Sequence, residues 1–143
     1  MSCIFCKIIA NEAEASKIYE DDDLLAFLDI HPVREGQTLI VPKHHVDHFS
    51  DIPDQLASRI FLKAHQLSKV IRQKLNPERM GLVVHGYGVP HAHLIIVPQA
   101  DETDITSGRM AEIRDGKIIY SMEKLPSVPR PELDRLAKII RDY

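Results

Sequence analysis

The alternation of apolar and polar positions divides the first third of the chain into a short helix and three strands. Residues 3–10 place their apolar side chains at helical spacing. Residues 17–20 and 24–29 are apolar runs separated by the acidic turn 21–23, a pattern that predicts a β-hairpin. Residues 37–42 are rich in β-branched side chains and end at a proline, which predicts another strand.

The clearest helical periodicity covers residues 54–75, where one face is apolar. Residues 81–85 and 91–98 are short apolar runs joined by a tight connection, and we expect them to be antiparallel neighbours. Beyond residue 98 the chain becomes polar, with a weak strand or turn at 116–120 and an amphipathic helix from 131 to 141. This order of elements predicts an α+β fold built on an antiparallel sheet.

The composition is that of one globular domain. The chain has 143 residues, 44% of them hydrophobic, and a formal net charge of -3, values that argue against disorder. The near-neutral charge excludes a dedicated nucleic-acid binder, whose domain pI typically exceeds about 9. No apolar run reaches the roughly 18 residues that span a bilayer, and the first residues lack the order of a secretory signal. We therefore expect a cytoplasmic protein without membrane or nucleic-acid partners.

Eight histidines stand out, and two of them lie in one predicted strand. His91 and His93 are two residues apart, so in a strand both side chains project from one face. An imidazole needs a partner for each ring nitrogen when it is buried, which makes such a pair unusual as core filling. A neutral imidazole here is a candidate nucleophile, general base or metal ligand, and the strand pattern does not choose among these roles.

The two cysteines, Cys3 and Cys6, have the C-x-x-C spacing that lets both thiolates reach one zinc ion. Two further ligands would have to come from the histidines near residues 44–48 or 91–93. A redox pair is a second interpretation, although that motif usually follows a strand in a βαβ unit. A third is that both cysteines are small buried apolar residues.

Asp29 follows an apolar strand, where a carboxylate is placed to bind sugar hydroxyls or to form a turn with the backbone that follows it. The histidines at 31, 48 and 65 have no partner pattern, and we interpret them as surface residues.

Four separated blocks of sequence together resemble the histidine triad (HIT) superfamily. They are Cys-Ile-Phe-Cys-Lys-Ile-Ile at 3–9, an apolar block ending Phe-Leu-Asp-Ile at 19–30, Gly-Gln-Thr-Leu-Ile-Val-Pro-Lys-His-His-Val at 36–46, and Val-Pro-His-Ala-His-Leu-Ile-Ile-Val-Pro at 89–98. The resemblance implies an α+β HIT-like fold with a five-stranded antiparallel sheet, one long and one short helix, and a homodimer formed through the long helix and a strand. It implies a HIT-like nucleotide-binding domain over residues 1–100. Residues 101–143 lie outside the resemblance, and we expect them to form a C-terminal extension of the same domain with a terminal helix.

The resemblance also implies roles for individual residues. His93 takes the position of the histidine that attacks the α-phosphate of a purine nucleotide or dinucleotide. Members of this family with an N-terminal Cys-x-x-Cys hold a structural zinc. The zinc ligands implied here are Cys3, Cys6, His45 and His91. The nucleotide-binding residues implied are Phe5, Ile8, Phe27, Asp29, Ile30 and Val89, with Asp29 on the ribose hydroxyls.

Two departures from the family pattern bear on activity. The third triad position is Ile95, and the connection before the triad, 85–90, is short. Loss of a proton-transfer group costs about 10²–10⁴ in rate, and His85 on the neighbouring strand is a candidate replacement. We predict hydrolysis or transfer of a nucleotidyl group from phosphoramidates or dinucleoside polyphosphates. The alternatives are a catalytically impaired nucleotide-binding sensor or regulatory protein, and a hydrolase whose catalytic metal is held by His91 and His93 with one or both cysteines.

Overall fold

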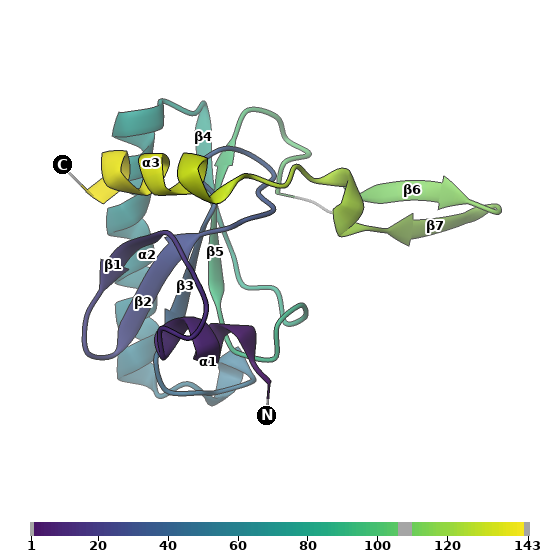
Figure 1. Cartoon of the computed structure of the whole chain (residues 1–143). Helices are drawn as coiled ribbons and strands as arrows, with labels where there is room; N and C mark the ends of the chain where they lie inside the picture. Colours follow the sequence, from purple (N-terminus) through teal and green to yellow (C-terminus); the bar gives the residue numbers. More distant parts are fainter. Residues whose placement is uncertain (1, 106–109, 142–143) are drawn as a thin grey trace.

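A five-stranded antiparallel sheet forms the centre of the molecule, with strand order β1-β2-β3-β5-β4 (Figure 1). The computed structural model describes residues 2–105 and 110–141. The strands of this sheet are β1 (Lys17–Glu20), β2 (Leu24–Leu28), β3 (Thr38–Pro42), β4 (Arg79–Val83) and β5 (Leu94–Gln99). The predicted α+β class with a five-stranded antiparallel sheet is confirmed.

Three helices accompany the sheet: α1 (Ile4–Ile9), α2 (Asp54–Leu75) and α3 (Arg130–Arg141). Helix α2 has the bounds predicted from its periodicity, and the apolar face that the sequence indicated is buried. It ends at Asn76, which adopts the left-handed conformation with φ of 52° and donates its N–H to the carbonyl of Arg72. Pro77 follows and cannot continue the helix.

The two faces of the sheet support separate apolar clusters. On β2, Leu24, Ala26 and Leu28 point into one cluster, while Leu25 and Phe27 point into the other. The first cluster is shared with α2 and α3, and the second with α1. All five residues of β2 are therefore buried, which explains why this strand is a continuous apolar run instead of an alternating one.

The C-terminal helix α3 shares the first apolar cluster with the sheet. Its residues Leu133, Leu136, Ala137 and Ile140 are all buried there. The Ser16 hydroxyl donates a hydrogen bond of 2.6 Å to Asp134, which ties the start of β1 to this helix. The helix that follows the polar tail is therefore packed into the same core as the N-terminal strands.

The segment that carries His91 and His93 differs from the expectation. We predicted a strand over 91–98, but β5 begins only at Leu94, and both histidines precede it in irregular backbone. The reason is that the N–H of Ala92 donates to the carbonyl of Val46 (2.7 Å), a residue in the loop after β3. Pro90 adds a position that has no N–H to donate. The expected antiparallel pairing of the two runs is confirmed by β4 and β5, although β4 begins two residues earlier than predicted.

A second, two-stranded sheet projects from the body, formed by β6 (Ala111–Arg114) and β7 (Lys117–Tyr120) (Figure 1). We predicted only a weak strand or turn at 116–120, so β6 was missed. Asp115 and Gly116 join the strands, both with positive φ (52° and 74°), as a tight hairpin turn requires. Within the described part of the chain, no helix is long and apolar enough to cross a membrane.

Candidate functional site

Four potential metal ligands from three distant segments converge at one end of the sheet. Cys3 immediately precedes α1 and Cys6 lies within it, His45 follows β3, and His91 precedes β5. One ligand atom from each residue lies within 4.8 Å of all the others. The structure therefore brings together the four residues that the sequence resemblance implied as a group.

The separations within this cluster fit a tetrahedral ion. Cys6 Sγ lies 3.2 Å from His45 Nδ1, the two Nδ1 atoms of His45 and His91 are 3.2 Å apart, and Cys3 Sγ is 3.6 Å from His91 Nδ1. Zinc bonds of about 2.3 Å to sulfur and 2.0–2.1 Å to nitrogen place tetrahedral ligands about 3.3–3.8 Å apart. The set of two thiols and two imidazoles is a donor combination that favours zinc.

The protonation of His91 suits a metal ligand. Its Nε2 lies 2.8 Å from the carbonyl oxygen of Pro42, and because a carbonyl can only accept, Nε2 carries the proton and Nδ1 presents its lone pair to the cluster. Burial lowers the pKa of His91 despite this backbone hydrogen bond, which keeps the imidazole neutral. Burial, together with the neighbouring Cys3, raises the pKa of the Cys6 thiol, so metal binding would displace a proton there.

His93 is held in one tautomer by the backbone. Its Nδ1 lies 2.7 Å from the carbonyl oxygen of His91, so Nδ1 donates and Nε2 retains a free lone pair. The Phe5 ring packs edge-on against His93, with centroids 5.4 Å apart, and makes similar contacts with His91 and Phe27. Phe5 sits between the two cysteines in sequence, so the residue that orients the imidazole belongs to the same short segment as two metal ligands.

A cavity of about 320 Å³ opens beside His93. His85, Val89 and His48 line it together with His93. His85 and His93 thus line one cavity, and the role of His85 as a proton donor stays a prediction. His48 is exposed, as expected of a surface residue, and it also lines this cavity. It lies three residues after His45, just before the 3-10 turn η1 (Phe49–Asp51).

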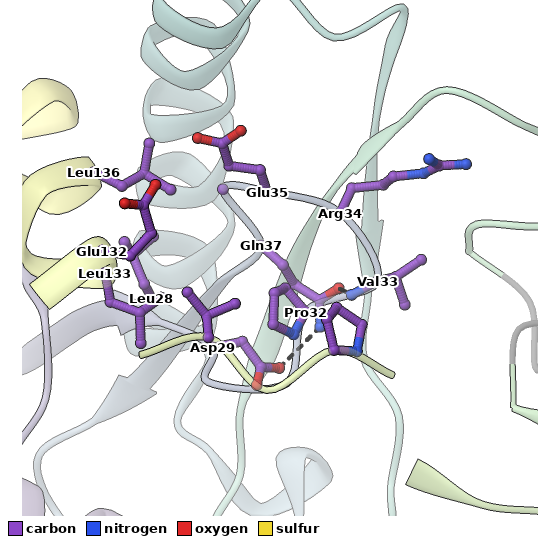
Figure 2. Close-up of a pocket in the computed structure, with 13 residues that line it drawn as sticks. Leu28, Asp29, Pro32, Val33, Arg34, Glu35, Gln37, Glu132, Leu133 and Leu136 are labelled. Atoms are coloured by element: carbon purple, nitrogen blue, oxygen red, sulfur yellow. Dashed lines mark hydrogen bonds between the residues drawn. The ribbon is translucent and has the colours of Figure 1, made fainter. Parts of the chain in front are cut away.

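Asp29 lies at a second cavity, of about 350 Å³, between the turn after β2 and helix α3 (Figure 2). One carboxylate oxygen accepts a hydrogen bond from the N–H of His31 (2.9 Å), and the other accepts one from the Gln37 amide (2.8 Å). The carboxylate therefore shapes the turn, which is the second of the two roles considered for it. Each oxygen keeps a further lone pair that can accept from a hydroxyl.

The other expected nucleotide-binding residues fall into two groups. Phe5, Ile8 and Phe27 are buried in the second apolar cluster, and Val89 packs against it. Ile30 is 44% exposed. Ile95 at the third triad position lies opposite Leu39 in the sheet and also packs against the second cluster. This position therefore offers apolar surface and no group that can donate a proton.

Comparison with known proteins agrees with this arrangement. The HIT domain family model matches residues 10–102. Protein hit from Bacillus subtilis is 36% identical over 108 residues, 72% of this chain and 74% of that protein. The adenosine 5'-monophosphoramidase HNT1 of Candida albicans is 36% identical over 96% of this chain and 93% of its own length. A zinc-bound histidine triad family protein from Mycobacterium smegmatis superposes with a TM-score of 0.73 at 26% identity, covering 99% of this chain and 92% of that one. On the match of the family model and of these relatives, the chain belongs to the HIT family.

Proposed function

We propose that this protein is a nucleotidyl hydrolase or transferase that acts on nucleoside phosphoramidates or dinucleoside polyphosphates and uses His93 as its nucleophile. The observation that carries the proposal is the fixed tautomer of His93, with Nδ1 bound to a backbone carbonyl and the ring at the wall of a cavity. The similarity to an adenosine 5'-monophosphoramidase supports the substrate class.

The chemistry follows from the free lone pair on His93 Nε2. This atom attacks the α-phosphorus, a P–N bond to His93 forms, and the bond from phosphorus to the leaving amine or phosphate breaks with its electron pair going to the leaving group. The imidazole becomes positively charged in the intermediate, and the hydrogen bond from Nδ1 to the carbonyl of His91 stabilises that charge. Attack by water, which loses a proton, or by another acceptor then releases the nucleotide and restores neutral His93.

An amine leaving group needs a proton, and Ile95 cannot supply one. His85 and His48 line the same cavity as His93, and a protonated imidazole can act as a general acid toward a leaving group. We assign proton delivery to this pair. General acid catalysis of this kind contributes about 10²–10⁴ in rate, so the pair can offset the loss at the third triad position.

The nucleoside is assigned to the apolar side of the site. Phe5, Ile8 and Phe27, which are buried in the second apolar cluster, would lie beneath the base, while Val89 and the exposed Ile30 would supply contact surface. The ribose hydroxyls are assigned to Asp29, whose oxygens each retain an accepting lone pair beyond their turn hydrogen bonds. The base would therefore bind through apolar contact and the sugar through the carboxylate.

The metal site is assigned a structural role. Cys3, Cys6, His45 and His91 supply four protein ligands, which leave no coordination position for substrate. When bound, zinc would cross-link α1 to the loops that carry His45 and His91. The buried ring of Phe5 would thereby be held against His93, which preorganises the nucleophile.

A homodimer through α2 and β4 completes the proposal. Strand β4 is at the edge of the sheet, with one hydrogen-bonded neighbour among the described strands. Apolar side chains are exposed there and on the helix, namely Leu82 and Val84 in and after β4, and Phe61 and Leu62 on α2. An exposed edge strand with an apolar margin is a surface that proteins normally cover.

Turnover tests the proposal. We expect the wild-type protein to hydrolyse adenosine or guanosine phosphoramidates or dinucleoside polyphosphates, and the H93A variant to retain nucleotide binding without turnover. The observation favouring the alternative, a nucleotide-binding regulatory protein, is the apolar third triad position. Binding without turnover in both proteins would establish that alternative. Binding by neither would contradict both functions.

A further inference from the structure

The β6–β7 hairpin, or arm, has one apolar and one charged face. Ile113 lies directly opposite Ile118, and Ala111 lies opposite Tyr120, so these four side chains share a face. Glu112, Arg114 and Lys117 lie on the other face together with Ile119. In the chain as described, Ile113 is 80% exposed, Ile118 66% and Tyr120 62%. These are the large apolar side chains of a cross-strand cluster, left open to water.

An isolated two-stranded hairpin is marginally stable in water, and contiguous exposed apolar surface usually marks an interaction site. The arm pairs with no strand of the five-stranded sheet in the described part of the chain. Its base is nevertheless fixed, because the N–H of Ser121 donates to the carbonyl of Met110 (2.8 Å) and the Lys124 ammonium donates to the carbonyl of Ala111 (3.0 Å). The hairpin is thus built as a defined element whose apolar face lacks a cover.

The segment before the arm lies against β4, the edge strand of the main sheet. Ile105 packs on Gly81 in β4 so closely that an added Cβ at Gly81 would lie 2.2 Å from its terminal carbon. Asp104 fixes the same segment by accepting hydrogen bonds from Arg34 (2.7 Å) and from the N–H of Ala100 (2.8 Å). The arm extends away from the body of the molecule, on the side opposite β1 (Figure 1).

We infer that the apolar face of the arm docks on a second copy of this chain that meets the first along β4. This inference rests on the homodimer in the proposed function and adds to it an element outside the sheet and α2. A molecule seated on the β4 edge would lie beside the strand against which the segment before the arm packs. In a two-fold dimer the contact occurs twice, since each copy donates one arm and receives the other.

The experiment compares two pairs of substitutions on the arm of the full-length chain. The I113T/I118T variant removes the apolar pair but keeps β-branched side chains, so the hairpin retains its strand propensity. The R114Q/K117Q variant alters the neighbouring cross-strand pair on the charged face and serves as the control. The dimer dissociation constant of each protein is measured by sedimentation equilibrium, with circular dichroism as the check on folding.

We expect I113T/I118T to raise the dissociation constant by at least about a hundredfold, because four buried isoleucines are lost per dimer, and R114Q/K117Q to leave it near that of the wild type. A photo-cross-linking residue at position 118 should then join isotopically light and heavy copies in a mixed sample. Equal dissociation constants for all three proteins, cross-links within one chain only, or a wild-type monomer would overturn the inference. Cross-linking to a different macromolecule instead would also overturn it.

Activity measured in the same samples separates this inference from the proposed function. If turnover depends on His93 but the dimer dissociation constant does not change with the arm substitutions, the proposed function stands and the docking of the arm is rejected. If the arm substitutions weaken the dimer but the wild type shows no turnover, the docking of the arm stands and the proposed enzymatic function is rejected.

Discussion

Substituting Ile140 by Ala tests whether the C-terminal extension belongs to the folding unit of the main sheet. Ile140 in α3 is fully buried in the first apolar cluster, whereas the adjacent Ile139 is 36% exposed. The two substitutions are chemically identical and lie on the same helix. Any gain in helix propensity from Ala therefore affects both variants equally, and the difference between them isolates the packing of α3 against the sheet.

The expected magnitude follows from this burial. Replacing a fully buried isoleucine by alanine costs about 2–5 kcal/mol, a large part of the roughly 5–15 kcal/mol by which such domains are stable. An unfolding entropy of about 2.1 cal/mol/K per residue converts this into a fall in Tm of about 7–17 °C for a chain of this length. For I139A we expect a change below about 1 kcal/mol, since exposed positions contribute little.

Urea unfolding followed by circular dichroism measures both variants, with thermal melts as a second reading. We expect one cooperative transition in each protein and a clear loss of stability in I140A alone. Equal and small effects of the two substitutions would refute the packing of α3 into the shared core. A two-step transition in which I140A destabilises the first step and leaves the second unchanged would show that the extension unfolds separately from the sheet.

Three further predictions concern the metal, the proton donors and acid stability. H45A should bind much less zinc than the wild type in a chelator-dye titration and melt at a lower temperature, whereas H44A should match the wild type in both, since His45 and not His44 belongs to the proposed ligand set. Equal zinc content in the two variants would be inconsistent with the site. The double variant H48A/H85A should slow hydrolysis of substrates with amine leaving groups about 10²-fold and spare substrates whose leaving group needs no proton. Equal slowing of both substrate classes would argue against a role in proton delivery. The hydrogen bond from the Lys43 ammonium lowers the pKa of the Glu20 carboxyl. The contribution of this carboxylate to stability is therefore fully present above the ordinary carboxyl pKa of about 4.3, and it is lost as the pH falls through the lower pKa of the folded state. E20Q should therefore show a smaller loss of stability on acidification than the wild type, and superimposable pH profiles would contradict this linkage.

The elements with strong local signals were the ones that the sequence predicted well. Helix α2 repeats its apolar positions over 22 residues, and this face could be buried only against one large partner, the sheet. The strand at 91–98 was placed too early because the backbone at Ala92 bonds to Val46, a contact between residues far apart in sequence. Local hydropathy contains no information about that contact.

In the functional site, too, local sequence signals identified some residues and not others. The spacing of Cys3 and Cys6 indicated two metal ligands, but the full set joins positions up to 88 residues apart, so only the family resemblance identified it as a group. The position of His48 at the cavity beside His93 could not be read from the sequence, because a cavity is formed by several loops together. Asp115-Gly116 is a recognised hairpin signal, and such a turn indicates a strand on each side of it, here β6 and β7.

The central claim is that His93 forms a covalent bond to the nucleotide during turnover. The most direct measurement is rapid quenching of the protein with an adenosine phosphoramidate, under conditions that preserve phosphoramidate bonds, followed by intact mass analysis and peptide mapping. We predict one adenylyl group per chain on the peptide that contains residue 93, present in the wild type and absent in H93A. Turnover by the wild type with no adduct at any quench time, or an adduct that persists in H93A, would contradict the account.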